Sequence, residues 1–150
     1  MAALEIPVAA IRLDAPLRTG AEALTALAEL LAPAAGRPAA QIAQALQERE
    51  GQGSTGIGHG VALPHARLEG LTEVAIAALR SARGLPFAAP DGEDVQLFIA
   101  VLVPRSAPTI HLETLSALAA RLADAGLRER LRSTGDATDF QQQLIAAPAG

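Results

Sequence analysis

Cysteine and lysine are both absent from the 150 residues of this chain, as are tyrosine and tryptophan. Without cysteine there is no disulfide, no thiol nucleophile and no cysteine-ligated zinc. Because all twelve basic residues are arginine, Schiff-base chemistry and a P-loop lysine are excluded as well. With only three phenylalanines, the core is expected to consist of Leu, Ala, Val and Ile.

Charge and hydropathy limit the kinds of partner that the chain is expected to bind and the compartment in which it is expected to be found. The formal net charge is −4 and no long basic run is present, which argues against nucleic acid as a partner. No apolar run approaches the ~18 residues of a transmembrane helix, so no membrane insertion is expected. The early Glu5 and the lack of a basic leader argue against a signal peptide. These features predict a cytoplasmic protein.

The length predicts one domain, residues 1–150. Thr19 and Glu22 form a capping box that predicts the start of a helix, which Pro33 and Gly36 are expected to stop. Periodic and apolar patterns predict further helices at 38–50, 109–124, 127–132 and 138–145, and strands at 61–64, 73–79 and 95–103. Residues 6–12 are expected to form a short strand or an extended lead-in. This alternation predicts an α/β fold with a mixed central β-sheet flanked by helices on both sides. The last two strands are expected to pair through a hairpin-like connection.

A glycine-rich segment, GQGSTGIGHG, occupies residues 51–60, and five of its ten residues are glycine. This density predicts an irregular loop whose backbone N–H groups are open to close approach. Its first six residues match G-x-G-x-x-G literally. They follow a predicted helix rather than a strand, however, so a dinucleotide site is disfavoured.

The three histidines are the candidate reactive groups. His65 is predicted to end the strand after the glycine segment, where side chains often face a crevice at the edge of a sheet. His111 falls in the first turn of a predicted helix, where free N–H groups and partial positive charge favour an anion. His59 lies within the polar loop, and an ordinary surface residue is the favoured interpretation there.

Formation of a phosphohistidine on His65 would need only a neutral imidazole with one free nitrogen and positive charge nearby. Phosphoryl transfer depends mainly on positioning and on stabilising the phosphoryl oxygens. Arg49 and Arg67 are close to His65 in the expected arrangement, and a guanidinium there would keep the imidazole neutral. The hydroxyls of Ser54 and Thr55 and the loop amides would add donors. A solvated helix end fits the position of Arg49 equally well.

Two other chemistries can be weighed against phosphoryl transfer. A zinc-dependent hydrolase would need His59, His65 and His111 to converge on one metal ion. A serine hydrolase would need a nucleophile elbow, and no G-x-S-x-G pattern is present. A pure binding module that uses the fold without the chemistry is a further alternative.

Three blocks of the sequence resemble one known family. Residues 49–71, which include STGIGHGVALPH, residues 87–104 and the segment HLETLSALAARLAD at 111–124 are similar in order and spacing to the enzyme IIA domains of the bacterial phosphotransferase system. The resemblance covers about residues 4–146 and is to the fructose/mannitol class, type 2. Within that class it is strongest to the nitrogen-regulatory members.

The resemblance implies a role for each matched residue. His65 matches the histidine that is phosphorylated, at Nε2, and His111 matches the second histidine, which contacts the phosphoryl group. Arg49 matches the arginine that stabilises the charge, and Ser54 and Thr55 match phosphoryl-binding loop positions. His59 falls where the family has various polar residues. No metal and no cofactor are implied.

The resemblance also implies a function and partners. The chain would be a phosphocarrier, an intermediate in phosphoryl transfer rather than an enzyme that turns over a small molecule. An HPr- or NPr-like protein would donate the phosphoryl group to His65. The output would be binding to a regulatory target in nitrogen control. Alternatively, a sugar-specific enzyme IIA would pass the group to a IIB domain for fructose or mannitol.

Overall fold

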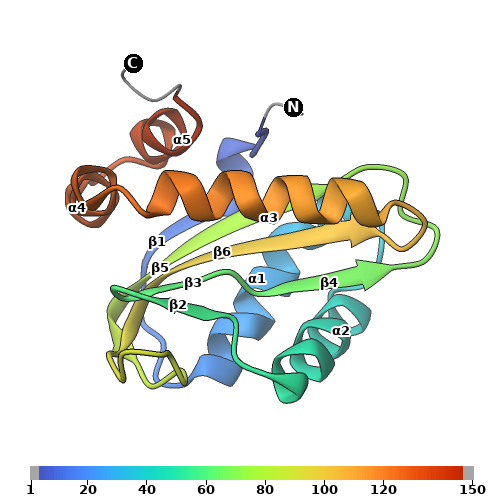
Figure 1. Cartoon of the computed structure of the whole chain (residues 1–150), viewed down its shortest axis with the longest axis horizontal. Helices are drawn as coiled ribbons and strands as arrows, with labels where there is room; N and C mark the ends of the chain where they lie inside the picture. Colours follow the sequence, from blue (N-terminus) through green and yellow to red (C-terminus); the bar gives the residue numbers. More distant parts are fainter. Residues whose placement is uncertain (1–3, 147–150) are drawn as a thin grey trace.

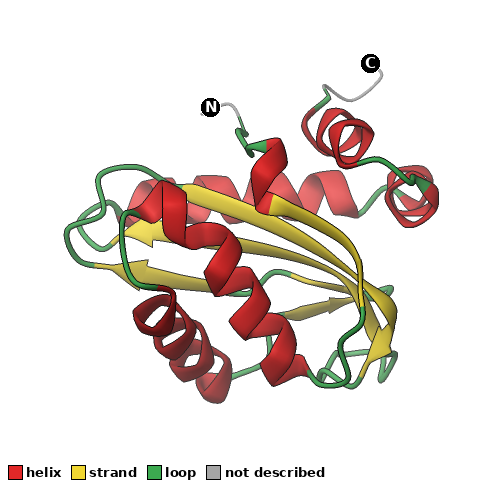
Figure 2. Ribbon diagram, turned by 180° about the vertical axis from the view of Figure 1, so that it is seen from behind, coloured by secondary structure: helices red, strands yellow, loops and turns green. Residues whose placement is uncertain are grey.

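The computed structural model describes residues 4–146, which form three layers (Figure 1). A sheet of six strands lies in the middle, with strand order β1-β5-β6-β3-β2 and with β4 also paired to β6. Helices α1 and α2 cover one face of the sheet, and α3 covers the other, together with α4 and α5 (Figures 1 and 2). The predicted α/β fold with a mixed sheet between helices is therefore confirmed.

The element boundaries follow the predicted pattern in most places. A 3₁₀ turn at Val8–Ala10 precedes the strands, which are β1 Ile11–Ala15, β2 Gly56–Gly58, β3 Val61–Ala62, β4 His65–Leu68, β5 Ala75–Leu85 and β6 Val95–Pro104. The helices are α1 Gly20–Ala35, α2 Ala39–Gln52, α3 Pro108–Leu122, α4 Ala125–Ser133 and α5 Ala137–Ile145. The predicted strand at 6–12 is thus shifted, because the 3₁₀ turn occupies its centre. Within residues 4–146, no helix is long and apolar enough to span a membrane.

Helix α1 shows one predicted feature and corrects another. Its capping box is present, because the Glu22 backbone N–H donates to Thr19 Oγ1 at 3.1 Å and the Thr19 N–H donates to Glu22 Oε1 at 3.1 Å. The prediction that Pro33 stops the helix is wrong, since Pro33 lies inside it. Proline removes only one intrahelical bond, and the helix ends two residues later. Gly36, in the left-handed conformation with φ 64°, ends it.

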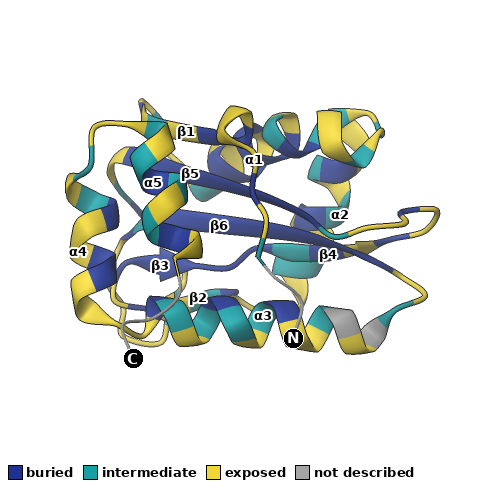
Figure 3. Ribbon diagram, turned by 90° about the horizontal axis from the view of Figure 1, so that it is seen from above, coloured by how far each residue is buried: buried dark blue, intermediate teal, exposed yellow. Residues whose placement is uncertain are grey.

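The centre of the core is the antiparallel pair β5 and β6, which Figure 3 shows as buried over most of their length. Every residue of β6 except Gln96 is buried, so the continuous apolar run at 95–103 is covered on both faces. Their pairing confirms the predicted hairpin-like connection. The core is mainly aliphatic, but Phe98 and Phe140 are also fully buried in it.

Strand β6 carries two short parallel strands on its other edge. Val61 of β3 is opposite Leu97, and His65 of β4 is opposite Val101. Leu63 and Pro64 interrupt the pairing between them, and the Pro64 carbonyl accepts from the Val101 N–H at 2.9 Å. His65 therefore begins a strand, whereas the sequence predicted that it ends one. Proline has no N–H for the ladder, which explains the break before His65.

Candidate active site

His65 has one ring nitrogen fixed by the backbone of its own strand. Its Nδ1 is 2.9 Å from the Leu63 carbonyl oxygen. A carbonyl can only accept, so Nδ1 carries the hydrogen and donates it. In the neutral ring this leaves Nε2 with a free lone pair. The imidazole is half-buried, and it is one of the residues that line a cavity beside β4.

His111 faces His65 from the first turn of α3. The two ring centroids are 5.2 Å apart, and the rings meet edge to face at 71°. His111 Nδ1 is the one fully buried side-chain nitrogen or oxygen without a hydrogen-bond partner within residues 4–146. A hydrogen on this nitrogen would be a buried donor with no acceptor, which is costly. The favoured tautomer of His111 therefore carries its hydrogen on Nε2, as a potential donor.

Arg49 reaches the same cavity from the last turn of α2. Its Nη1 donates to the Gly53 carbonyl at 2.9 Å, which ties the helix end to the start of the glycine segment. The cavity has a volume of about 890 Å³, and Arg67 of β4 also lines it. The structure thus brings His65, His111 and Arg49 together, as the sequence predicted. The remaining lining residues are Gln41, Ala45, Glu48, Gln52, Ala66, Leu68, Glu69 and Arg105.

The surroundings keep both imidazoles neutral. The pKa of His65 lies below its ordinary value of 6.5, mainly because burial disfavours the charged ring, with Arg49 and Arg67 adding to the effect. The Leu63 carbonyl and Glu50 oppose this by favouring the protonated ring. The pKa of His111 is lowered by burial first, and then by His65, Arg67 and Arg49. At neutral pH the cavity therefore offers an uncharged nucleophile beside guanidinium groups.

Ser54 and Thr55 do not line this cavity. Ser54 Oγ donates to the Ala88 carbonyl and accepts from the Gly56 N–H at 3.1 Å. Thr55 donates twice to the Glu50 carboxylate, from its N–H at 2.9 Å and from its hydroxyl at 2.7 Å. Both hydroxyls thus hold the loop that follows α2. Their direct contact with a phosphoryl group stays a prediction.

The three histidines do not share one cavity, because His59 lines a different one. Within the described part of the chain, no group of three or more His, Cys, Asp or Glu residues is arranged to hold a metal ion. The convergence of histidines that a zinc site would need is not found there.

Two residues that line or shape the candidate site, Arg105 and Glu50, were not identified from the sequence. Arg105 reaches the cavity because β6 runs parallel to β4, and its N–H donates to the Leu68 carbonyl at 3.1 Å. Glu50 anchors Thr55 and thereby shapes the loop next to Arg49. Parallel pairing between distant segments leaves no local signal for Arg105. An acidic residue five positions before a loop threonine is likewise too common a spacing to be noticed.

Comparison with known proteins agrees with this geometry. Residues 6–147 match the family described as "Phosphoenolpyruvate-dependent sugar phosphotransferase system, EIIA 2". The chain belongs to this family, and it is a phosphocarrier component of that system.

The relatives include both fructose-specific and nitrogen regulatory members of the family. The fructose-specific EIIA component of Haloferax volcanii is 38% identical over 127 residues, covering 83% of this chain and 82% of the relative. A nitrogen regulatory protein of Pseudomonas aeruginosa is 40% identical over 109 residues, covering 73% of this chain and 71% of its own. The chain is therefore about equally similar in sequence to a fructose-specific and to a nitrogen regulatory relative.

Solved structures show the same fold. The crystal structure of the nitrogen regulatory protein IIA-Ntr from Neisseria meningitidis has a TM-score of 0.89 at 34% identity, covering 93% of this chain and 95% of that one. Enzyme IIAMtl of Escherichia coli, solved in complex with phosphorylated enzyme IIBMtl, has a TM-score of 0.79 at 19% identity, covering 95% and 99%. The second likeness is one of fold alone.

Proposed function

We propose that Nε2 of His65 accepts a phosphoryl group from a histidine-phosphorylated donor protein and passes it on. The observation that carries this is the bond from His65 Nδ1–H to the Leu63 carbonyl, which leaves Nε2 as the only nucleophilic nitrogen of the neutral ring. The proposal keeps the cytoplasmic location and the HPr- or NPr-like donor predicted from the sequence.

The transfer step uses groups already in place. As the bond from phosphorus to Nε2 forms, the bond from phosphorus to the donor imidazole breaks, and its electron pair returns to the donor ring. Positive charge develops on the His65 ring, and the Leu63 carbonyl stabilises it by accepting from Nδ1–H. No proton has to leave His65 during the step.

The phosphoryl oxygens meet positive charge and one further donor. Arg49, Arg67 and Arg105 line the cavity, against the carboxylates of Glu48 and Glu69. Guanidinium groups suit phosphoryl oxygens because their N–H donors form charge-assisted pairs. In the tautomer argued above, the Nε2–H of His111 is an uncharged donor for the phosphoryl oxygens. His111 therefore contacts the phosphoryl group in the proposal but does not carry it.

We propose nitrogen regulation as the output of the carrier. Support comes from the nitrogen regulatory relatives and from the likeness to the Neisseria IIA-Ntr structure, at 34% identity and a TM-score of 0.89. In that case the phosphorylation state of His65 controls binding to a regulatory target protein. The fructose-specific relative of Haloferax volcanii, at 38% identity, favours a second candidate, a sugar-specific enzyme IIA that delivers the group to a IIB domain.

Labelling by a phosphorylated donor tests the carrier function. Purified protein is incubated with an HPr-like protein phosphorylated on histidine, and acid-labile phosphate on this chain is measured. We expect about one phosphoryl group per chain in the wild type, none in His65→Ala, and full labelling in the matched control His59→Ala, because His59 lines another cavity. Equal labelling of wild type and His65→Ala, or no labelling of either, would refute the proposal.

A second arm of the experiment separates the two outputs. The labelled protein is mixed with an isolated fructose-type IIB domain, and the phosphate on each partner is followed over time. Retention of label on this chain supports the regulatory output. Rapid and complete movement to the IIB domain supports the sugar-specific one.

A further inference from the structure

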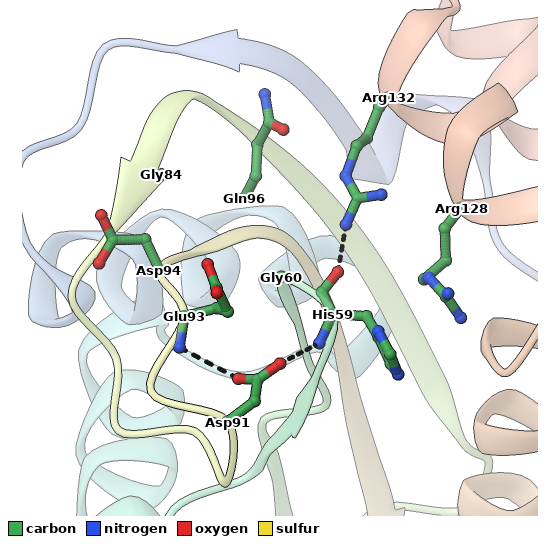
Figure 4. Close-up of a pocket in the computed structure, with 9 residues that line it drawn as sticks. All are labelled: His59, Gly60, Gly84, Asp91, Glu93, Asp94, Gln96, Arg128 and Arg132. Carbon is green, nitrogen blue, oxygen red and sulfur yellow. Dashed lines mark hydrogen bonds between the residues drawn. The ribbon is translucent and has the colours of Figure 1, made fainter. Parts of the chain in front are cut away.

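A second cavity, of about 450 Å³, lies between α4 and the 86–94 connection that joins β5 to β6 (Figure 4). Arg128 in its wall donates from Nη1 to the carbonyls of Leu122 and Ala123, at 2.9 and 3.0 Å, where α3 ends. His111 is in the first turn of the same helix. At 1.5 Å of rise per residue this is about 17 Å from Leu122, so the cavity is separate from the active site.

Arg128 is a buried cation that has no carboxylate partner among the residues that the structure describes. Only 9% of the residue is exposed, and its protein partners are the two carbonyls at Nη1. The ion pair found within residues 4–146 is a different one, between Arg80 and Asp14. Nε and Nη2 of Arg128 donate to no protein acceptor there and are not sealed from solvent. The carbonyls at the end of α3 satisfy Nη1, and the solvent-facing Nε and Nη2 remain available to pair with an anionic group of a ligand.

The wall around Arg128 is held in place before any ligand binds. His59 has φ 58°, a left-handed conformation that is uncommon for a residue other than glycine. Its N–H donates to Asp91 Oδ2 at 2.8 Å, and its carbonyl accepts from Arg132 Nη2. Figure 4 shows these bonds, with His59 between the arginines of α4 and the acidic residues of the connection. The side chains on both walls thus fix the turn that separates them.

The opposite wall is acidic. Asp91, Glu93 and Asp94 place three carboxylates against the two guanidinium groups of Arg128 and Arg132. The pKa of Asp91 is lowered because the N–H groups of His59 and Glu93 donate to its carboxylate, so it stays ionised. A simple anion would be repelled by this wall, and a simple cation by the arginines. Among the described residues that line the cavity, only His59 has an aromatic ring, which leaves little for a nucleobase to stack on.

We propose that this cavity binds a small zwitterion of the α-amino acid class. Its carboxylate would pair with Arg128 and Arg132, and its ammonium group would face Asp91, Glu93 and Asp94. The volume lies within the range of about 300–1,000 Å³ that is usual for small-molecule sites. The inference rests on Arg128 and on the two oppositely charged walls, and it does not depend on phosphoryl transfer at His65.

NMR titration of the full chain tests the site. Each of the common L-amino acids is added in turn, with acetate and methylammonium as probes that carry only one of the two charges. We expect at least one amino acid to bind with a Kd of about 1 mM or tighter and to shift the amides of His59, Gly60 and Gln96. Acetate and methylammonium should bind at least about tenfold more weakly, because each leaves one wall unpaired.

Matched variants locate the binding. Arg132→Gln and the double variant Glu93→Gln, Asp94→Asn should each weaken binding about tenfold or more. Arg130→Gln and Glu129→Gln each remove one charge of the corresponding sign from α4 outside the cavity and should leave binding unchanged. Unchanged binding in His65→Ala keeps this test separate from that of the carrier function. The proposal is overturned if no amino acid binds at that strength, if acetate binds equally well, or if the control variants weaken binding as much.

Discussion

The charge state of His65 decides whether the cavity can accept a phosphoryl group. Because its pKa lies below 6.5, the neutral nucleophile predominates at pH 7. We expect the rate of phosphoryl acceptance to be constant from neutral pH upward and to fall on acidification only below about pH 6.5, where the ring gains a proton. Rates measured against pH with the phosphorylated donor, beside an NMR titration of the imidazoles, check this. A fall that begins above pH 7 would contradict it.

Arg49 should contribute to this pKa as well as to phosphoryl binding. Its guanidinium lowers the pKa of both His65 and His111. In Arg49→Gln we therefore expect both values to rise towards 6.5, and the acidic limb of the rate profile to move to higher pH. Arg83→Gln is the matched control, since Arg83 is exposed on β5 and does not line the cavity. Equal shifts in the two variants would mean that the effect is one of net charge alone.

For the individual residues of the site, the sequence predicted which side chains lie together, but not how every one of them is oriented. His65, His111 and Arg49 gather as expected, since the end of α2, the start of β4 and the first turn of α3 converge beside β6. Ser54 and Thr55 were expected to face the same cavity, and their hydroxyls instead engage Ala88 and Glu50. The Ser54 hydroxyl is oriented by Ala88, a residue distant in sequence that a local motif does not specify.

The glycine segment, taken as an element, is more regular than its composition predicted. Residues 51 and 52 continue α2, and Gly56–Gly58 form β2, which pairs with β3. The expectation of a wholly irregular loop is therefore wrong. Glycine is disfavoured in strands through its entropy, but the pairing of β2 with β3 supplies hydrogen bonds that offset this. The close approach of Ala88 and Ala89 to the β2 backbone explains why glycine is needed at position 56.

Gly56 and Gly51 give opposite predictions for the same substitution. A Cβ at Gly56 would lie 3.0 Å from the Ala88 oxygen and 3.0 Å from Ala89 Cβ, so Gly56→Ala should destabilise the protein by about 1–3 kcal/mol. A Cβ at Gly51, inside α2, would meet nothing within 4 Å, and Gly51→Ala should stabilise by up to about 1 kcal/mol. Urea unfolding at equilibrium measures both. Changes of the same sign would show that steric room does not distinguish the two positions.

For the whole molecule, the sequence predicted the layers and the central hairpin but not the edges of the sheet. Long apolar runs made β5 and β6 recognisable, and their closeness in the chain made antiparallel pairing the natural expectation. Strand β4 was not predicted, because four residues carry too little periodicity. Its position was set by the parallel register of His65 with Val101, a contact between residues far apart in the chain.

Arg80 joins the sheet to the C-terminal helices, and the cost of removing it should come from carbonyl groups rather than from its ion pair. Its side chain is 5% exposed, and it donates to the Leu131 carbonyl at 3.0 Å, to the Thr134 carbonyl and to the Asp14 carboxylate at 3.0 Å. The Asp14 side chain is 66% exposed, so the ion pair itself contributes only about 0–1 kcal/mol.

Arg80→Met, which keeps the aliphatic packing, leaves the two carbonyls at the end of α4 without this donor. We expect it to lower the free energy of unfolding by about 1–3 kcal/mol for each carbonyl that stays unsatisfied. Asp14→Asn is the matched variant: asparagine tolerates the positive φ of 56° at this position, and the loss should stay below about 1 kcal/mol. Denaturant unfolding gives both values, and hydrogen exchange in α4 and α5 should increase in Arg80→Met alone. Equal losses in the two variants would assign the stabilisation to the ion pair, because only that interaction is shared by both substitutions.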